Sequence, residues 1–362
     1  MPTLFSTPLS TAAQAAYAEL LEVTRHQELS RSVENLSGSF NRKVVKGATY
    51  WYYQFTESAG GGTRQIFVGP DSDKTRALVE RARTKSAARL DAMAKAAATL
   101  GCASTTPAHF RIVRRLNEIG FFRAGGLLVG THAFLAYGNA LGVAWGDLAR
   151  THDIDFAHAG NSIALALPAT LTIETRSAIE SLESGFLPVP GFNPGDETAS
   201  FVSKVDKHLR VDFLAPMVGG RADVFRHESL GVNLQPLRFL EFVLEDIDQA
   251  AVLSAVGAVM VNVPDPARYA LHKMLVYAER RNRNPQKAMK DLRQAAALVE
   301  ALGSIRADAV EELWCDLLER GAGWRDRARK GLVAIEEIAP GLGLVKAMRA
   351  RLSAFTAKGK AR

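Results

Sequence analysis

Apolar residues recur with a helical period at the start of the chain, and the pattern changes after residue 30. Residues 10–29 repeat apolar side chains every three to four positions, and Thr11 and Gln14 have the spacing of a capping box, so this stretch predicts a helix. Its expected core side consists of Ala15, Ala16, Leu20, Leu21 and Val23. Residues 37–70 are rich in aromatic and β-branched side chains and are broken by glycine turns, which predicts a small antiparallel meander.

Residues 71–100 return to a helical pattern and predict one long helix. One side of it has heptad-like spacing and carries Leu90, Met93, Ala97 and Leu100. The other side carries the cations Arg76, Arg81, Arg83, Lys85, Arg89 and Lys95. Such a row is usually a solvated helix face, and the alternative is a track for phosphates or for an acidic partner.

Gly101 and Pro107 mark a change of organisation. The residues that follow alternate short predicted helices and strands, whereas nearly everything from residue 266 onward has helical periodicity. We therefore expect an α+β fold with three regions. These are an N-terminal helix, meander and basic helix over 1–104, a mixed region over 105–265 and a helical region over 266–362.

Composition narrows the class of protein. Hydrophobic residues make up 47% of the 362 residues and charged residues 23%, which is typical of a globular protein with a sizeable core. The net charge of +7 permits a polyanionic partner without requiring one. Two distant cysteines, a longest apolar run of only 251–263 and the lack of a signal-peptide pattern predict a cytoplasmic protein that does not enter a membrane.

The clearest chemical motif is THDIDF, at residues 151–156. Asp153 and Asp155 are two positions apart, so in a strand both carboxylates lie on the same face and the apolar residues beside them point to the core. Two carboxylates this close repel each other, and a hard divalent cation with oxygen ligands removes that repulsion. The alternative is an exposed strand end with two solvated acids.

A third acid stands in a similar setting further along the chain. Asp212 interrupts the apolar strand pattern of HLRVDFLAPM, residues 208–217, where an unpaired carboxylate is costly. Residues 199–206 are expected to form a hairpin with this strand. If the strand lies beside 151–156, Asp212 completes a cluster of three carboxylates that can hold two metal ions about 3.5–4 Å apart.

A glycine pair precedes an apolar stretch and a predicted helix in RAGGLLVGTHAFLAYGNALG, residues 123–142. Gly125 and Gly126 let the backbone approach a ligand closely, and free N–H groups at the helix start near Thr131 suit a phosphate. A tight turn without a ligand is the more common reason for such a pair.

The order of these motifs resembles the nucleotidyltransferase superfamily that includes DNA polymerase β. In that superfamily a Gly-Gly or Gly-Ser pair opens a helix, an acid-x-acid pair follows, and a third acid lies on a neighbouring strand. The residue sequences of individual motifs are similar to those of a bacterial family of uncharacterised nucleotidyltransferase-fold proteins. These motifs are GGLLVGTHAF, THDIDF, LRVDFLAP, QPLRFLEF, VPDPARYALHKML and KAMKDLRQA. The resemblance covers about 105–300. One departure is the 27 positions from Gly126 to Asp153, which imply an insertion or an extended loop.

The resemblance implies a fold and a reaction. The fold is a nucleotidyltransferase-type mixed sheet with flanking helices. The reaction moves a nucleoside monophosphate from a nucleoside triphosphate to an acceptor and releases pyrophosphate. The resemblance assigns Asp153, Asp155 and Asp212 to Mg²⁺ or Mn²⁺, with Asp212 nearest the nucleophile. Backbone N–H groups near Gly126 and Thr131 would hold the phosphates.

Two lysines are the expected partners of the triphosphate by analogy with the superfamily. Lys273 is the first candidate, on a predicted helix that also offers Arg268, and Lys290 on the next helix is the second. The alternative is that both are ordinary surface cations, each worth little.

Three functions fit the sequence. The first is Mg²⁺-dependent nucleotidyl transfer to a macromolecule, either an RNA such as tRNA or a protein. The second is a nucleotide-binding or partner-binding module that keeps the fold with little or no catalysis, and the third is a toxin-type transferase paired with an antitoxin. The presence of all three acids favours the first. The long helix over 71–100 leaves open whether the chain forms a homodimer.

Overall fold

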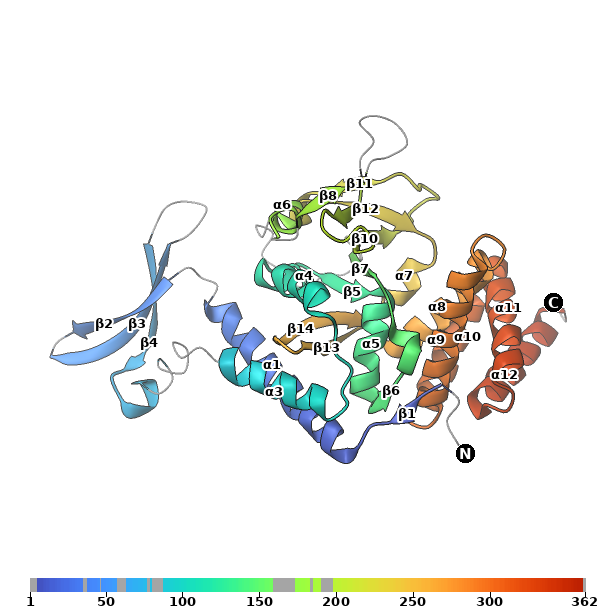
Figure 1. Ribbon diagram of the computed structural model, residues 1–362, viewed down its shortest axis with the longest axis horizontal. Helices are drawn as coiled ribbons and strands as arrows, with labels where there is room; N and C mark the ends of the chain where they lie inside the picture. Colours follow the sequence, from blue (N-terminus) through green and yellow to red (C-terminus); the bar gives the residue numbers. More distant parts are fainter. Residues whose placement is uncertain are drawn as a thin grey trace.

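The fold is given by a computed structural model, which describes residues 5–34, 38–45, 47–56, 63–76, 79, 87–158, 173–182, 185–189 and 198–360. It is an α+β fold, as the sequence predicts, with a mixed sheet near the centre and helices around it (Figure 1). A separate two-stranded hairpin, β13 (Ile247–Ser254) and β14 (Gly257–Pro264), lies below that sheet in the view of Figure 1.

The central sheet has seven strands, of which the main path runs β11-β12-β10-β7-β5. Strand β10 lies parallel to both β7 and β12, whereas β5 is antiparallel to β7. Strand β9 pairs antiparallel with the first half of β10, which confirms the predicted hairpin. The strands are β5 (Gly126–Val129), β7 (Asp153–His158), β8 (Phe186–Pro188), β9 (Ser200–Ser203), β10 (Arg210–Pro216), β11 (Phe225–His227) and β12 (Val232–Leu237).

Alternating burial explains why β7 and β10 lie side by side. Ile154 and Phe156 of β7 are fully buried, and so are Val211 and Phe213 of β10. The rings of Phe156 and Phe213 stack with their centroids 5.6 Å apart, so the apolar faces of the two strands favour one register. The residues between them, which include the predicted site acids, therefore face the other side of the sheet.

One hydrophobic core joins the sheet to the C-terminal helices. It extends from Phe110 of α4 (Pro107–Glu118) to Leu352 of α12 (Gly343–Lys360). The helices that contribute between them are α5 (Gly130–Leu141), α6 (Thr175–Glu180), α7 (Leu240–Val243), α8 (Pro266–Arg280), α9 (Pro285–Gly303), α10 (Ala307–Glu319) and α11 (Ala322–Ile338). The helical region after residue 266 is confirmed, while the domain boundaries at 104/105 and 265/266 stay a prediction.

Helix α1 (Thr11–Glu34) begins where the sequence predicts, with a different cap and a different buried side. The Ser10 hydroxyl accepts the N–H of Ala13 at 3.2 Å, so the cap precedes the predicted Thr11. Of the predicted core side only Leu20 is buried. The cause is the Tyr17 hydroxyl, which donates to a carbonyl of β13 at 3.3 Å and turns its own side of the helix toward the β13–β14 hairpin.

The predicted meander is confirmed. Strands β2 (Gly38–Val45), β3 (Ala48–Thr56) and β4 (Thr63–Pro70) form an antiparallel sheet that stands apart at the left of Figure 1. Of the predicted helix over 71–100, the described part is helical at 73–76 and in α3 (Ala87–Thr99). Three of its predicted cations, Arg81, Arg83 and Lys85, lie outside the described residues.

The long spacing between the glycine pair and the acids is filled by ordered elements rather than by one loop. Helix α5 is followed by β6 (Val143–Ala144), which pairs antiparallel with β1 (Thr7–Pro8), and then by the short 3-10 helix η1 (Gly146–Ala149). Within the part of the chain that is described, no helix combines the length and the apolar character needed to cross a bilayer.

Candidate active site

A cavity of about 840 Å³ lies between the central sheet, the start of α5 and helices α8 and α9. Six of the eight residues proposed from the sequence line it, although they come from five different elements. They are Thr131, Asp153, Asp155, Asp212, Lys273 and Lys290. The fold thus brings together residues that are up to 159 positions apart in the chain, while their individual roles stay a prediction.

The strand register places the acids on one face. Asp155 of β7 is the direct Cα partner of Asp212 of β10 in the parallel ladder. Asp153, two residues earlier, is paired with Arg210 in the same way. Because side chains alternate along a strand, these four share a face, and all of them line the cavity.

Asp155 is an acid whose environment disfavours its charged form. Burial, and then repulsion from Asp212, raises the pKa of Asp155 from 3.8 to about 6. No lysine, arginine or histidine of the described residues forms an ion pair with Asp155 or Asp212. Asp212 Oδ1 accepts a hydrogen bond of 2.5 Å from the Ser200 hydroxyl, which orients the carboxylate without neutralising it. The two acids therefore face each other without a bound counter-charge.

The donor set suits a hard divalent cation. It consists of the carboxylate oxygens of Asp153, Asp155 and Asp212, and burial together with repulsion from Asp212 makes the charged form of Asp155 costly, a cost that a bound cation would relieve. As the side chains stand, no group of three or more His, Cys, Asp or Glu among the described residues forms a ready metal cluster. Mg²⁺ takes one or two carboxylates and completes its shell with water and substrate phosphates, so the site fits an ion that binds together with a nucleotide.

The glycine pair does not line this cavity. Gly126 lies at the start of β5, whereas Val129, at the other end of the strand, is the partner of Asp155. A Cβ on Gly126 would lie 2.2 Å from the Phe121 ring, and one on Gly125 would lie 3.0 Å from a histidine nitrogen. Close packing therefore explains both glycines, and a role of Gly125 and Gly126 in phosphate binding stays a prediction.

The glycine that the cavity requires is Gly130, the first residue of α5. Its φ of +61° lies in the left-handed region, and a Cβ there would lie 2.0 Å from Asp155 Oδ2. Its carbonyl accepts a 2.7 Å hydrogen bond from the Tyr269 hydroxyl, which ties the start of α5 to α8. The first N–H groups of a helix have no partner inside the helix and suit an anion, which places Thr131 well for a phosphate. The sequence feature that could have identified Gly130 is a glycine where an apolar strand turns directly into a helix.

Lys273 lines the cavity and is already held by an acid. Its side chain is 12% exposed, and its Nζ lies 2.5 Å from Asp291 Oδ1. Arg280 Nη1 lies 2.9 Å from the other oxygen of Asp291. Burial opposes the charge on Lys273, but Asp291 outweighs burial and keeps the pKa of Lys273 above its ordinary value. Lys273 therefore stays positive at neutral pH, and its charge lowers the pKa of Asp155.

The other cations near the cavity differ in whether protein groups already bind them. Lys290 Nζ donates to the carbonyl of Arg150 at 2.7 Å and so joins α9 to the segment before β7. Lys287, which sequence reasoning did not select, is largely exposed and has its Nζ 3.7 Å from Asp153 Oδ2. Arg268 was expected to be available for anions, but it is buried and pairs with two acids of the segment after α7, away from the cavity.

The cavity changes character along β10. Its lining residues on that strand run from Arg210 through Asp212 to Leu214. The basic end, near Arg210, also contains Arg150, His152, Lys207, His208 and Lys287. The neutral end, near Leu214, contains Gln235, Leu237, Leu240, Val243 and Val276. The sequence could not rank these residues because they are ordinary types with no motif spacing.

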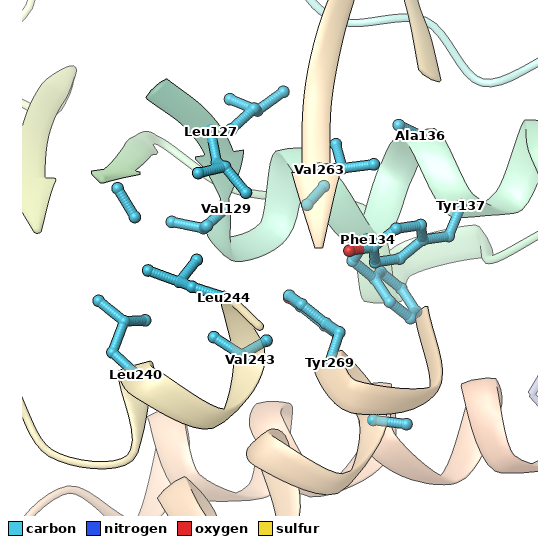
Figure 2. Packing of buried hydrophobic residues seen from close by; sticks show 14 of the residues in the cluster. Leu127, Val129, Phe134, Ala136, Tyr137, Leu240, Val243, Leu244, Val263 and Tyr269 are labelled. Atoms are coloured by element: carbon cyan, nitrogen blue, oxygen red, sulfur yellow. The ribbon is translucent and has the colours of Figure 1, made fainter. Parts of the chain in front are cut away.

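Buried residues beside the cavity hold its walls together. Figure 2 shows Leu244, the residue after α7, close to Val129 of β5, and Tyr269 of α8 packs beside Tyr137 of α5. The rings of Tyr137 and Tyr269 are 5.2 Å apart and meet edge to face. Helices α5, α7 and α8 are therefore packed into one unit, so the residues they contribute keep their relative positions.

A family model described as nucleotidyltransferase matches residues 108–319, which is more than half of the chain. The matched region contains the whole cavity lining. No curated protein and no solved structure gives a significant match.

Proposed function

The chain belongs to the nucleotidyltransferase family, and on that premise we propose that it moves a nucleoside monophosphate from a nucleoside triphosphate to an RNA acceptor in a Mg²⁺-dependent reaction. Family membership supports nucleotidyl transfer in general and a nucleoside triphosphate as substrate. The observation that carries the finer proposal is the pairing of Asp155 with Asp212, two carboxylates that share a face of the sheet and form no ion pair in the described part of the chain.

The three carboxylates Asp153, Asp155 and Asp212 would hold the metal. When bound, Mg²⁺ supplies charge neutralisation for the reacting phosphates. Asp212 is oriented by the Ser200 hydroxyl, and we assign it to the side of the attacking group. Its carboxylate would accept the proton that the attacking hydroxyl gives up.

The triphosphate belongs at the start of α5 and the basic end. The first N–H groups of α5, at Gly130 and Thr131, suit an anion, and Lys287 and Lys290 line the same cavity. In the reaction, the acceptor oxygen bonds to the α-phosphorus while the bond from that phosphorus to the leaving oxygen breaks, and pyrophosphate departs. The protein contributes positioning and preorganised charge, which are the main sources of rate in phosphoryl transfer.

An RNA acceptor is favoured over a protein by the charge of the chain and of the basic end. The net charge is +7, and Lys207 and Arg210 are exposed at the cavity and make no ion pair in the described part of the chain. Exposed cations of this kind bind a phosphate backbone. A protein acceptor, including the target of a toxin-type transferase, is the alternative outcome of the test below.

The test is transfer of label from α-labelled nucleoside triphosphates to RNA and protein extracts, followed by separate digestion with ribonuclease and protease. We expect Mg²⁺-dependent labelling that ribonuclease removes and that Asp155→Asn and Asp212→Asn abolish. The matched control is Asp223→Asn, an exposed acid that does not line the cavity, which should label like the wild type. Label that only protease removes would replace RNA by protein, and labelling that survives in the two site variants would overturn the proposal.

A further inference from the structure

The neutral end of the cavity offers hydrogen-bond acceptors. Gln235 lines this end, and its amide nitrogen donates to the carbonyl of Ala222 at 2.9 Å and to that of Pro236 at 3.4 Å. Two carbonyls can only accept, so this contact fixes which end of the amide is nitrogen. Nothing in the described part of the chain donates to Gln235 Oε1, which is therefore a fixed and unused acceptor.

A second acceptor comes from α8. His272 also lines the cavity, and its Nδ1 lies 3.1 Å from the carbonyl oxygen of Phe239. Because a carbonyl only accepts, the hydrogen of the neutral ring is on Nδ1 and the lone pair is on Nε2. Burial, with help from the charge of Lys273, lowers the pKa of His272 to about 3, so the ring stays neutral at physiological pH.

The rest of this end is apolar. Its other lining side chains are Leu214, Leu237, Leu240, Val243 and Val276. The nearby Tyr269 hydroxyl is occupied, since it donates to the carbonyl of Gly130. A flat apolar group with a hydrogen-bond donor on its edge is the ligand that matches such a lining.

The distance along the sheet suits a nucleoside. Gln235 is the strand partner of Leu214, which follows Asp212 by two residues. At about 3.3 Å per residue, the neutral end begins about 7 Å beyond the acids, roughly the span of a ribose between the α-phosphate and the base. A triphosphate at the basic end therefore places its nucleobase at the neutral end.

We propose that the neutral end binds the nucleobase and selects adenine and cytosine, which carry an amino group where guanine and uracil carry a carbonyl, so that ATP or CTP is used in preference to GTP or UTP. This inference rests on the proposed function. The amino group of adenine or cytosine donates to Gln235 Oε1 or His272 Nε2. A uracil or guanine carbonyl at that position would place an acceptor against acceptors, which leaves polar groups unpaired.

The experiment is calorimetric titration of the full chain with each of the four nucleoside triphosphates and with inorganic tripolyphosphate, in Mg²⁺ and without an acceptor. We expect ATP, CTP or both to bind about tenfold more tightly than GTP and UTP, the effect of one hydrogen bond and one avoided mismatch. Gln235→Met should reduce that preference to less than about threefold and leave tripolyphosphate binding unchanged. The matched control is Gln249→Met, an exposed glutamine of β13, which should bind like the wild type.

The results of these titrations distinguish a failure of the proposed base selection from a failure of the proposed function. Equal binding of all four triphosphates, or a preference for GTP or UTP, would overturn the base selection and leave the proposed function in place, as would a preference that Gln235→Met does not change. Failure of every triphosphate and of tripolyphosphate to bind would overturn the proposed function and the inference together. The wild-type comparison decides the matter even if a variant does not fold.

Discussion

Replacing Asp155 by asparagine should stabilise the metal-free protein while abolishing transfer. Asp155 is buried beside its strand partner Asp212 and forms no ion pair in the described part of the chain, so folding removes water from this carboxylate and brings a second negative charge close to it. Asparagine keeps the shape of the side chain and removes one of those charges. A site that binds a cation therefore lowers the stability of the protein when the cation is absent.

The size of the effect follows from the pKa of Asp155, which rises from 3.8 in a free chain to about 6 in the fold. A shift of about 2 units at ~1.4 kcal/mol per unit corresponds to about 3 kcal/mol. Because the pKa of Asp155 is higher in the fold than in the unfolded chain, the protonated carboxyl favours the fold. The contribution of the protonated carboxyl to the free energy of unfolding is therefore fully present below pH 3.8 and is lost as the pH rises through about 6. The variant does not titrate here, so its advantage should be small near pH 4 and reach about 3 kcal/mol near pH 8.

The assay is urea unfolding of wild type and Asp155→Asn in a chelator at several pH values, with the free energy of unfolding taken from each curve. The exposed Asp223→Asn is the matched control and should not change that free energy by more than about 0.5 kcal/mol. Addition of Mg²⁺ with a nucleotide should stabilise the wild type and not Asp155→Asn. An Asp155→Asn protein that is less stable than the wild type at pH 8, or a gain that does not grow with pH, would refute the reasoning.

Three further predictions concern the walls of the cavity. Gly130→Ala should abolish transfer because its Cβ would lie 2.0 Å from a carboxylate oxygen of the site. The control Gly146→Ala, with a similar φ of +56° and open space around it, should lower the free energy of unfolding by about 1 kcal/mol and keep transfer. Equal activity of the two variants would contradict the predicted clash. Tyr269→Phe should lower the free energy of unfolding by about 1 kcal/mol and kcat/KM about tenfold, because the start of α5 loses its hydrogen bond to α8; an unchanged kcat/KM would remove the positioning role. Lys273→Met should lower the free energy of unfolding by about 3 kcal/mol, because Asp291 then keeps only its exposed partner Arg280. Adding Asp291→Asn should recover part of that loss in a double-mutant cycle. Additive effects of the two substitutions would show that Lys273 and Asp291 are not coupled.

The acids of the site could be located from the sequence because their position depends on a short-range rule. Asp153 and Asp155 share a face through the two-residue period of a strand, and Phe156 beside them is a core residue. Asp212 lies in the same kind of pattern, with Phe213 next to it. Once the two buried phenylalanines stack, the register of the acids follows, so local periodicity predicted a long-range contact.

The glycine that lines the cavity, Gly130, could not be located in the same way, because its position depends on where a strand ends and a helix begins. Gly125, Gly126 and Gly130 are equally plausible in sequence. Only the packing separates them: Phe121 fills the space beside Gly126, and Asp155 fills the space beside Gly130. Sequence alone contains neither neighbour.

The cations were only partly predictable for a related reason. The sequence does not show whether a lysine or arginine forms an ion pair with an acid in the fold. Lys273 and Arg268 are both held by acids, one pair inside the cavity and the other away from it. Lys287 remains exposed beside Asp153, although no motif singles it out. Pairing decides which charges a ligand can use, and pairing belongs to the tertiary fold.

The most direct test of the site is calorimetric titration of Mn²⁺ into the full chain with a non-hydrolysable nucleoside triphosphate, for the wild type, Asp155→Asn, Asp212→Asn and Asp223→Asn. The account predicts metal binding that depends on the nucleotide, that both site variants weaken by at least about tenfold and that the control leaves unchanged. Metal binding that is equally tight in all four proteins would contradict it, because the ion would then be held elsewhere.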